Sequence, residues 1–214
     1  MRAGVNSSEE IMLTLKNELI PIFPLSITVL PGEKQKLHVF EPRYKQLMRD
    51  IKEMNWSFGI PFAKADILYK YGCYVKVLKT TSFDPETGEM DVIVEGQKTF
   101  LLKRLLSEHE EHPYDSALIE WLDDGFSQSC EDLLVEFRAY YDELKDKFRP
   151  FKDVSKMNNI WNIVKFLPLT EDEKIRFVSL HEPEKRRIFL KNKIKILRKI
   201  NKSASTLNEN IYFN

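Results

Sequence analysis

The segment IPIFPLSITVLPGEKQKLHVFEPRY, residues 20–44, changes from a strand pattern to a helix pattern within a few residues. Its proline and glycine residues divide the first part into short extended pieces, which is typical of a β-domain. In residues 35–40, Leu37 and Val39 fall on one face of a strand. Pro42 suits the first position of a helix, and apolar residues then recur at helical spacing: Tyr44, Leu47, Met48 and Ile51. The segment therefore predicts a strand that leads directly into a helix packed on the sheet.

Two further runs of alternating apolar residues predict a long β-hairpin. Residues 74–79 and 90–95 flank residues 84–88, where a proline and a glycine suit the backbone angles of a turn. A last strand is expected at residues 116–122, where apolar residues again alternate. We therefore expect residues 18–122 to form a β-rich subdomain.

The residue pattern changes after this point. Beyond Gly125 the chain has no further glycine, and apolar residues return at every third or fourth position, as in helices. Thr170 and Glu173 have the spacing of a capping box, which starts a helix. We expect residues 123–202 to form an α-helical bundle subdomain, a flexible segment at residues 1–17 and a tail at residues 203–214.

Composition excludes several classes of partner. Lys and Arg number 33 and Asp and Glu also number 33, so no net field draws the whole chain to nucleic acid or to an anionic membrane. Cys73 and Cys130 lie outside any paired metal-ligand spacing and fit a reducing compartment. No window approaches the roughly 18 apolar residues that span a bilayer, and the first residues lack the pattern of a secretion signal. We expect a soluble, cytoplasmic protein.

An ordered set of motifs resembles the Lon protease amino-terminal domain family. The set is IPIFPL (residues 20–25), VLPG (29–32) and LHVFEPRY (37–44), with weaker likeness at HPY (112–114) and FLPLT (166–170). The resemblance extends over most of the chain, to about residue 200. It implies an α+β fold, with a PUA-like β-rich amino-terminal domain followed by a carboxyl-terminal α-helical bundle.

The same resemblance implies a non-catalytic function. In full-length Lon proteases this domain helps to recognise unfolded substrates, and here we find no GxxxxGK(S/T) sequence that would hold nucleotide phosphates. We therefore expect a stand-alone substrate-binding module for unfolded or extended polypeptides, acting as an adaptor or holdase in protein quality control, with a separate protease as an implied partner. It is expected to be no enzyme and to need no cofactor.

Five residues of the motif are candidates for polypeptide binding: Phe23, Phe40, Glu41, Arg43 and Tyr44. The aromatic rings could line an apolar groove, and the charged groups could fix polar groups of a bound peptide. The alternative is that the rings form the core and that Glu41 and Arg43 serve the strand-to-helix junction. Sequence alone leaves both open, because buried and groove-lining aromatics have the same spacing.

A second hypothesis concerns the basic residues near the carboxyl terminus. Lys191, Lys195 and Arg198 belong to a helix rich in cations, and such a helix could bind the phosphates of RNA, as some PUA-like proteins do. The alternative is a solvated helix face, which we favour, so nucleic acid is the less favoured partner. The HxxH spacing at residues 109–112 precedes a proline in a polar stretch and predicts a surface loop, with no metal site.

Overall fold

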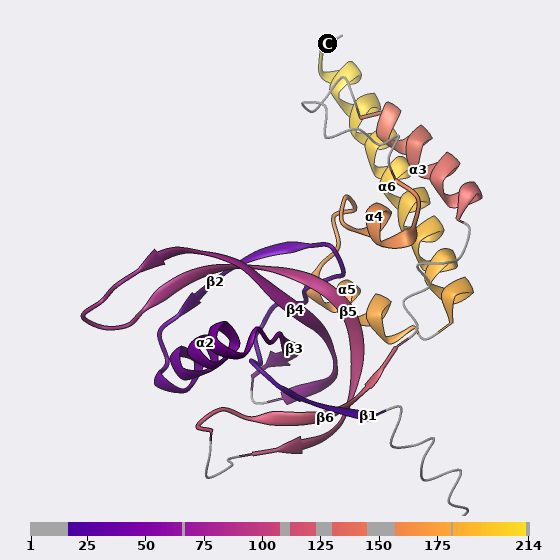
Figure 1. The fold of residues 1–214 in the computed structure, drawn as a ribbon. Coiled ribbons are helices and arrows are strands. Elements are labelled where there is room, and N and C mark those ends of the chain that lie inside the picture. Colours follow the sequence, from indigo (N-terminus) through magenta and orange to yellow (C-terminus); the bar gives the residue numbers. More distant parts are fainter. Residues whose placement is uncertain are drawn as a thin grey trace, which may run out of the picture. The chain divides into compact units, whose positions relative to one another are not determined.

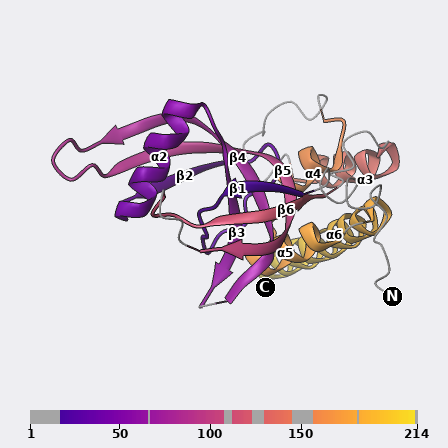
Figure 2. The ribbon, with the colours of Figure 1, turned by 60° about the horizontal axis from the view of Figure 1, so that its bottom comes forward.

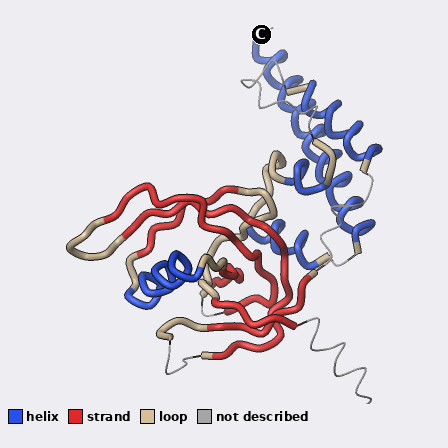
Figure 3. Tube along the Cα trace, in the orientation of Figure 1, coloured by secondary structure: helices blue, strands red, loops and turns tan. Residues whose placement is uncertain are grey.

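The computed structural model describes residues 17–65, 67–107, 112–122, 130–144, 157–180 and 182–212. The chain divides into two compact units. The first comprises Met1–Asp124 together with Thr170–Ser179, and the second comprises Gly125–Leu169 together with Leu180–Asn214. All the described strands lie in the first unit, and helices dominate the second (Figure 3). The expected bundle at residues 123–202 thus differs from the structure in one respect, because residues 170–179 belong to the β-rich unit.

The first unit is built on an antiparallel sheet of six strands in the described residues. Its main path runs in the order β1-β6-β5-β4-β3, and β2 pairs with β5 as well. The strands are β1 (Asn17–Pro21), β2 (Lys34–Val39), β3 (Phe58–Lys64), β4 (Ile67–Phe83), β5 (Met90–Leu106) and β6 (Ser116–Trp121). The predicted hairpin is confirmed, since β4 and β5 are long neighbouring strands joined by one short turn (Figure 1).

Helix α2 (Pro42–Met54) follows β2, as the sequence predicted. Pro42 lies in its first turn, and the helix ends at Asn55, whose φ of 53° is left-handed. Its buried residues include the four apolar residues expected to face the sheet: Tyr44, Leu47, Met48 and Ile51. They pack in one core cluster with residues of β2, β3, β4 and β5, which fixes α2 against the sheet.

Helix α5 (Glu171–Ser179) completes the first unit. Its capping box is confirmed: the amide of Glu173 donates to Oγ1 of Thr170 at 3.2 Å, and the amide of Thr170 donates to a carboxylate oxygen of Glu173 at 3.0 Å. The carboxylate of Glu171 accepts from the amide of Thr28, and Nζ of Lys174 lies 3.0 Å from Oε1 of Glu33. These bonds attach α5 to the loop between β1 and β2.

The second unit contains α3 (Glu131–Asp142), α4 (Ile160–Val164) and α6 (Pro183–Tyr212), which Figure 2 shows from another side. The buried residues of α3 recur at helical spacing, as the apolar pattern after Gly125 predicted in general: Leu133, Leu134, Phe137, Tyr140 and Tyr141. The structure differs from the sequence expectation at the carboxyl terminus, since α6 continues through most of the expected tail. The expected segment at residues 1–17 lies outside the described residues, apart from Asn17 in β1. None of the described helices is long and apolar enough to cross a membrane.

Candidate functional site

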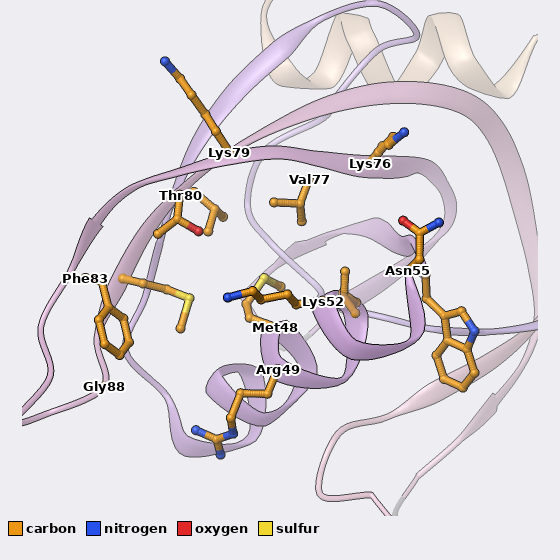
Figure 4. Close-up of a pocket in the computed structure, with 14 residues that line it drawn as sticks. Met48, Arg49, Lys52, Asn55, Lys76, Val77, Lys79, Thr80, Phe83 and Gly88 are labelled. Carbon is orange, nitrogen blue, oxygen red and sulfur yellow. The ribbon is translucent and has the colours of Figure 1, made fainter.

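A pocket of about 690 Å³ lies between α2 and the β4–β5 hairpin, wholly within the first unit (Figure 4). We call it the α2–hairpin groove. One wall is formed by α2 and the residues after it: Met48, Arg49, Ile51, Lys52, Asn55 and Trp56. The hairpin forms the other wall: Lys76, Val77, Lys79, Thr80, Phe83, Gly88, Met90 and Val92.

The strand pairing explains why a groove opens here. β3 pairs with β4 only as far as Val75, whereas β4 continues to Phe83 along β5. The outer part of the hairpin therefore has no further described strand along its β4 edge, and α2 packs against one face of this part. Side chains along a strand point alternately to its two faces, so only part of the hairpin residues can face the helix.

The floor of the groove is apolar and continuous with the core. Met48, Ile51 and Val92 are buried, and the half-buried Val77 and Met90 pack against the same core cluster. Two large rings are left exposed in the lining, since Trp56 is 46% exposed and Phe83 is 59% exposed. Exposed apolar side chains gathered in a hollow are the usual mark of a binding surface.

The rim of the groove is basic. Arg49 and Lys52 come from α2, Lys76 and Lys79 come from β4, and the lining contains no Asp or Glu. Figure 4 shows Lys52 lying across the space between helix and hairpin, with Lys76 and Lys79 extending from β4 away from α2. The groove thus concentrates positive charge on a chain whose formal net charge is zero.

Two of the five motif candidates are core residues. Phe23 and Tyr44 are 4% and 3% exposed, and their rings stack with a centroid distance of 3.8 Å. Burial raises the pKa of Tyr44 to about 12, which keeps its hydroxyl neutral. Both rings therefore form part of the core and do not line a groove, because a buried ring presents no surface to a peptide.

The other three motif candidates lie at the surface where β2 leads into α2. Phe40 is 56% exposed and stacks on His38 with a centroid distance of 5.8 Å. Nε of Arg43 lies 3.0 Å from a carboxylate oxygen of Glu41, and its guanidinium lies 4.5 Å from the ring centroid of Tyr44. The structure brings these residues together, but none of them lines the α2–hairpin groove.

Two of the three phosphate-binding candidates on α6 already pair with carboxylates of α3 or of the residue directly after it. Lys191 pairs with Asp132, and its Nζ lies 3.8 Å from Oε1 of Glu136. Arg198 pairs with Glu143, and this contact raises the pKa of the arginine. Lys195 is exposed. A phosphate would have to compete with these carboxylates, which cancel part of the positive charge of the helix and so weaken the case for an RNA site on it.

Sequence reasoning missed the groove as a site. Met48 and Ile51 were expected in the core, and Lys52, Lys76 and Lys79 belong to no motif. The available signal was weak: basic residues on two elements that only the fold brings together. Among the described residues no group of three or more His, Cys, Asp or Glu could hold a metal ion.

Comparison with known proteins identifies the fold and the family. The structure is similar to a Lon N-terminal domain protein from Xanthomonas campestris, with a TM-score of 0.62 and 21% identity, over 79% of this chain and 94% of that one. It is also similar to the N-terminal domain of Mycobacterium avium complex Lon protease, with a TM-score of 0.64 and 12% identity, over 83% of this chain and 98% of that one. Residues 19–207 match the model of the ATP-dependent protease La (LON) substrate-binding domain. Since this match covers most of the chain, the protein belongs to the LON substrate-binding domain family.

Proposed function

We propose that the α2–hairpin groove binds unfolded or extended polypeptide segments without chemical change to them. The observation that carries the proposal is the groove itself: a pocket of about 690 Å³ with an apolar floor, beside which Trp56 and Phe83 are exposed. Unfolded chains expose apolar side chains that folded proteins bury, and a preformed apolar hollow is suited to hold them. Membership of a substrate-binding domain family supports the same function.

The wider role that we propose is that of an adaptor or weak holdase in protein quality control. A groove that binds without catalysis keeps an unfolded segment from aggregating and can present it to a separate protease. Binding of this kind requires no cofactor. We place this role in the cytoplasm, because Cys73 and Cys130 are both free and buried, as is typical of proteins in reducing compartments.

The test is a fluorescence-anisotropy titration with a labelled polypeptide of near-zero net charge, kept unfolded by alkylation of its cysteines. We expect saturable binding that persists at moderate salt, because apolar contacts are insensitive to screening. Replacing both exposed rings, Trp56→Ser and Phe83→Ser, should weaken binding about tenfold, since aromatic anchors carry much of the energy of an interface. No binding up to roughly millimolar protein would refute the function.

The matched control is Ile67→Ser. Ile67 is 60% exposed at the start of β4 and does not line the groove, so the variant loses exposed apolar surface at a different place. It should bind like the native chain. Equal losses in the control and in the double variant would show that binding follows total apolar surface and does not occur in the groove.

The same titration tests the surface at the β2–α2 junction. We propose that Phe40, Glu41 and Arg43 extend the binding surface for segments longer than the groove, since an exposed ring and an ion pair lie together there. Phe40→Ser should then lower the affinity for a long polypeptide and leave the affinity for a short peptide unchanged. Unchanged affinity for both would assign these residues to the strand-to-helix junction alone.

A further inference from the structure

We propose that the α2–hairpin groove selects acidic amphipathic segments, in which Asp or Glu residues flank the apolar side chains that enter it. The inference rests on the polypeptide-binding function proposed above and adds the charge of the preferred segment. It is based on two features of the same surface, the apolar floor and the basic rim.

The cations of the rim are available to a ligand. Among the described residues no ion pair involves Arg49, Lys52, Lys76 or Lys79, and the one side-chain partner of Arg49 is the uncharged amide of Gln46. Other lysines of the first unit are used within the fold, as in the contact of Lys36 Nζ with Asp91 at 2.8 Å. Cations that lack a carboxylate partner repel each other and gain from an anionic ligand.

The arrangement of the cations fits a ligand with apolar and acidic groups close together. Lys52 lies across the groove, so a carboxylate bound near the floor is within its reach (Figure 4). Lys76 and Lys79 extend from β4 away from α2, so they would meet only the acidic residues that flank the apolar side chains of a bound segment. Lys52 thus faces the hollow, and the two lysines of β4 add positive charge outside it.

The floor favours a polypeptide over a nucleic acid as the anionic ligand. Its residues are aliphatic or thioether side chains, namely Met48, Ile51, Val77, Met90 and Val92. Such a surface complements Leu, Ile or Phe side chains, and methionine adapts to several shapes. Bases of single-stranded nucleic acid instead stack on aromatic side chains. The lining has two such rings, Trp56 and Phe83, which stand beside the floor and not in it, so an RNA oligomer is included in the test as the competing ligand.

The test uses three labelled peptides that share the same Leu and Phe positions and carry Glu, Gln or Lys at all other positions. Anisotropy titrations at low salt should rank affinity as Glu, then Gln, then Lys, with about a tenfold or larger difference between the extremes. The difference should shrink at moderate salt, because exposed charges are screened there.

Reversing the charge of two groove lysines tests the proposal more directly. Lys52→Glu with Lys76→Glu changes one cation on each wall and should reverse the ranking, so that the Lys peptide binds more tightly than the Glu peptide. The matched control is Lys70→Glu with Arg104→Glu, two exposed residues on β4 and β5 outside the groove. It has the same change in net charge and should keep the native ranking. Circular dichroism melts of both variants establish that each is folded.

The outcomes distinguish selection by charge from polypeptide binding itself. Equal affinity for all three peptides, or the same change in both double variants, would overturn charge selection and leave polypeptide binding in place. If neither the peptides nor the unfolded polypeptide bound, both charge selection and polypeptide binding would be refuted. A single-stranded RNA oligomer that bound as tightly as the Glu peptide, and lost binding in the Lys52→Glu, Lys76→Glu variant, would also overturn the proposal.

Discussion

The hydroxyl of Tyr114 donates a hydrogen bond of 2.7 Å to Oδ2 of Asp50, and both side chains are buried. The other oxygen of Asp50 accepts from Nε2 of Gln46 at 2.6 Å. This contact joins α2 to the segment just before β6, and it holds α2 in the position that forms one wall of the groove.

Tyr114→Phe should therefore destabilise the protein. The change leaves a buried carboxylate with one donor fewer, and loss of a hydrogen bond to a charged group costs about 1 to 3 kcal/mol. Urea denaturation monitored by circular dichroism measures this free energy of unfolding. Tyr69→Phe is the control, because no hydrogen bond of the Tyr69 hydroxyl is found within the described residues. Equal stability of the two variants would contradict the prediction.

Alkaline pH should destabilise the native chain through Tyr44 and Tyr114. Burial raises the pKa of Tyr44 to about 12, and burial together with Asp50 raises the pKa of Tyr114 well above its usual range. Above pH of about 10 the unfolded chain releases protons that the folded chain retains, so the free energy of unfolding falls as pH rises. Denaturation at a series of pH values should show this fall begin near pH 10 and continue toward about pH 12.

The Tyr44→Phe variant separates this effect from general alkaline unfolding. Its free energy of unfolding should depend less steeply on pH in the same window, since Tyr44 no longer titrates. A native chain whose stability stayed level up to about pH 12, or a variant with the native slope, would show that burial of Tyr44 does not control the pH dependence.

Thr170→Ala should destabilise the first unit by about 1 kcal/mol, because it removes the hydroxyl that accepts from the amide of Glu173 at the start of α5. Thr170→Ser keeps that hydroxyl and should retain most of the native stability. Urea denaturation of the three proteins measures the difference. If alanine and serine had the same effect, the capping box would contribute nothing to the docking of α5.

Gly96→Ala should be among the most damaging substitutions in the sheet. A Cβ at residue 96 would lie 2.2 Å from the carbonyl oxygen of Leu30, and backbone atoms cannot move aside as a side chain can. We expect a loss of about 3 kcal/mol or more in thermal or urea unfolding. Gly88→Ala is the comparison: its φ is 72°, but its surroundings are open, so the loss should be about 1 to 2 kcal/mol. A larger loss at residue 88 would contradict this ranking.

Local patterns in the sequence were sufficient for the elements and the family. Alternation predicted the β4–β5 hairpin, helical spacing predicted the buried face of α2, and the Thr170–Glu173 pair predicted the start of α5. Each of these depends on residues that are close in the chain, where backbone geometry alone sets which side chains share a face. The motif at residues 20–44 was likewise enough to indicate the LON substrate-binding domain family.

Only the tertiary structure decided which residues form the groove and which are buried. Phe23 and Phe40 belong to the same motif, yet one is 4% exposed and the other 56%, because burial depends on what other parts of the chain cover. The same holds for α5, which lies in the helical part of the sequence but packs in the β-rich unit. The groove joins Lys52 on α2 to Lys76 and Met90 on the hairpin, and no local periodicity encodes contacts between elements so far apart in the chain.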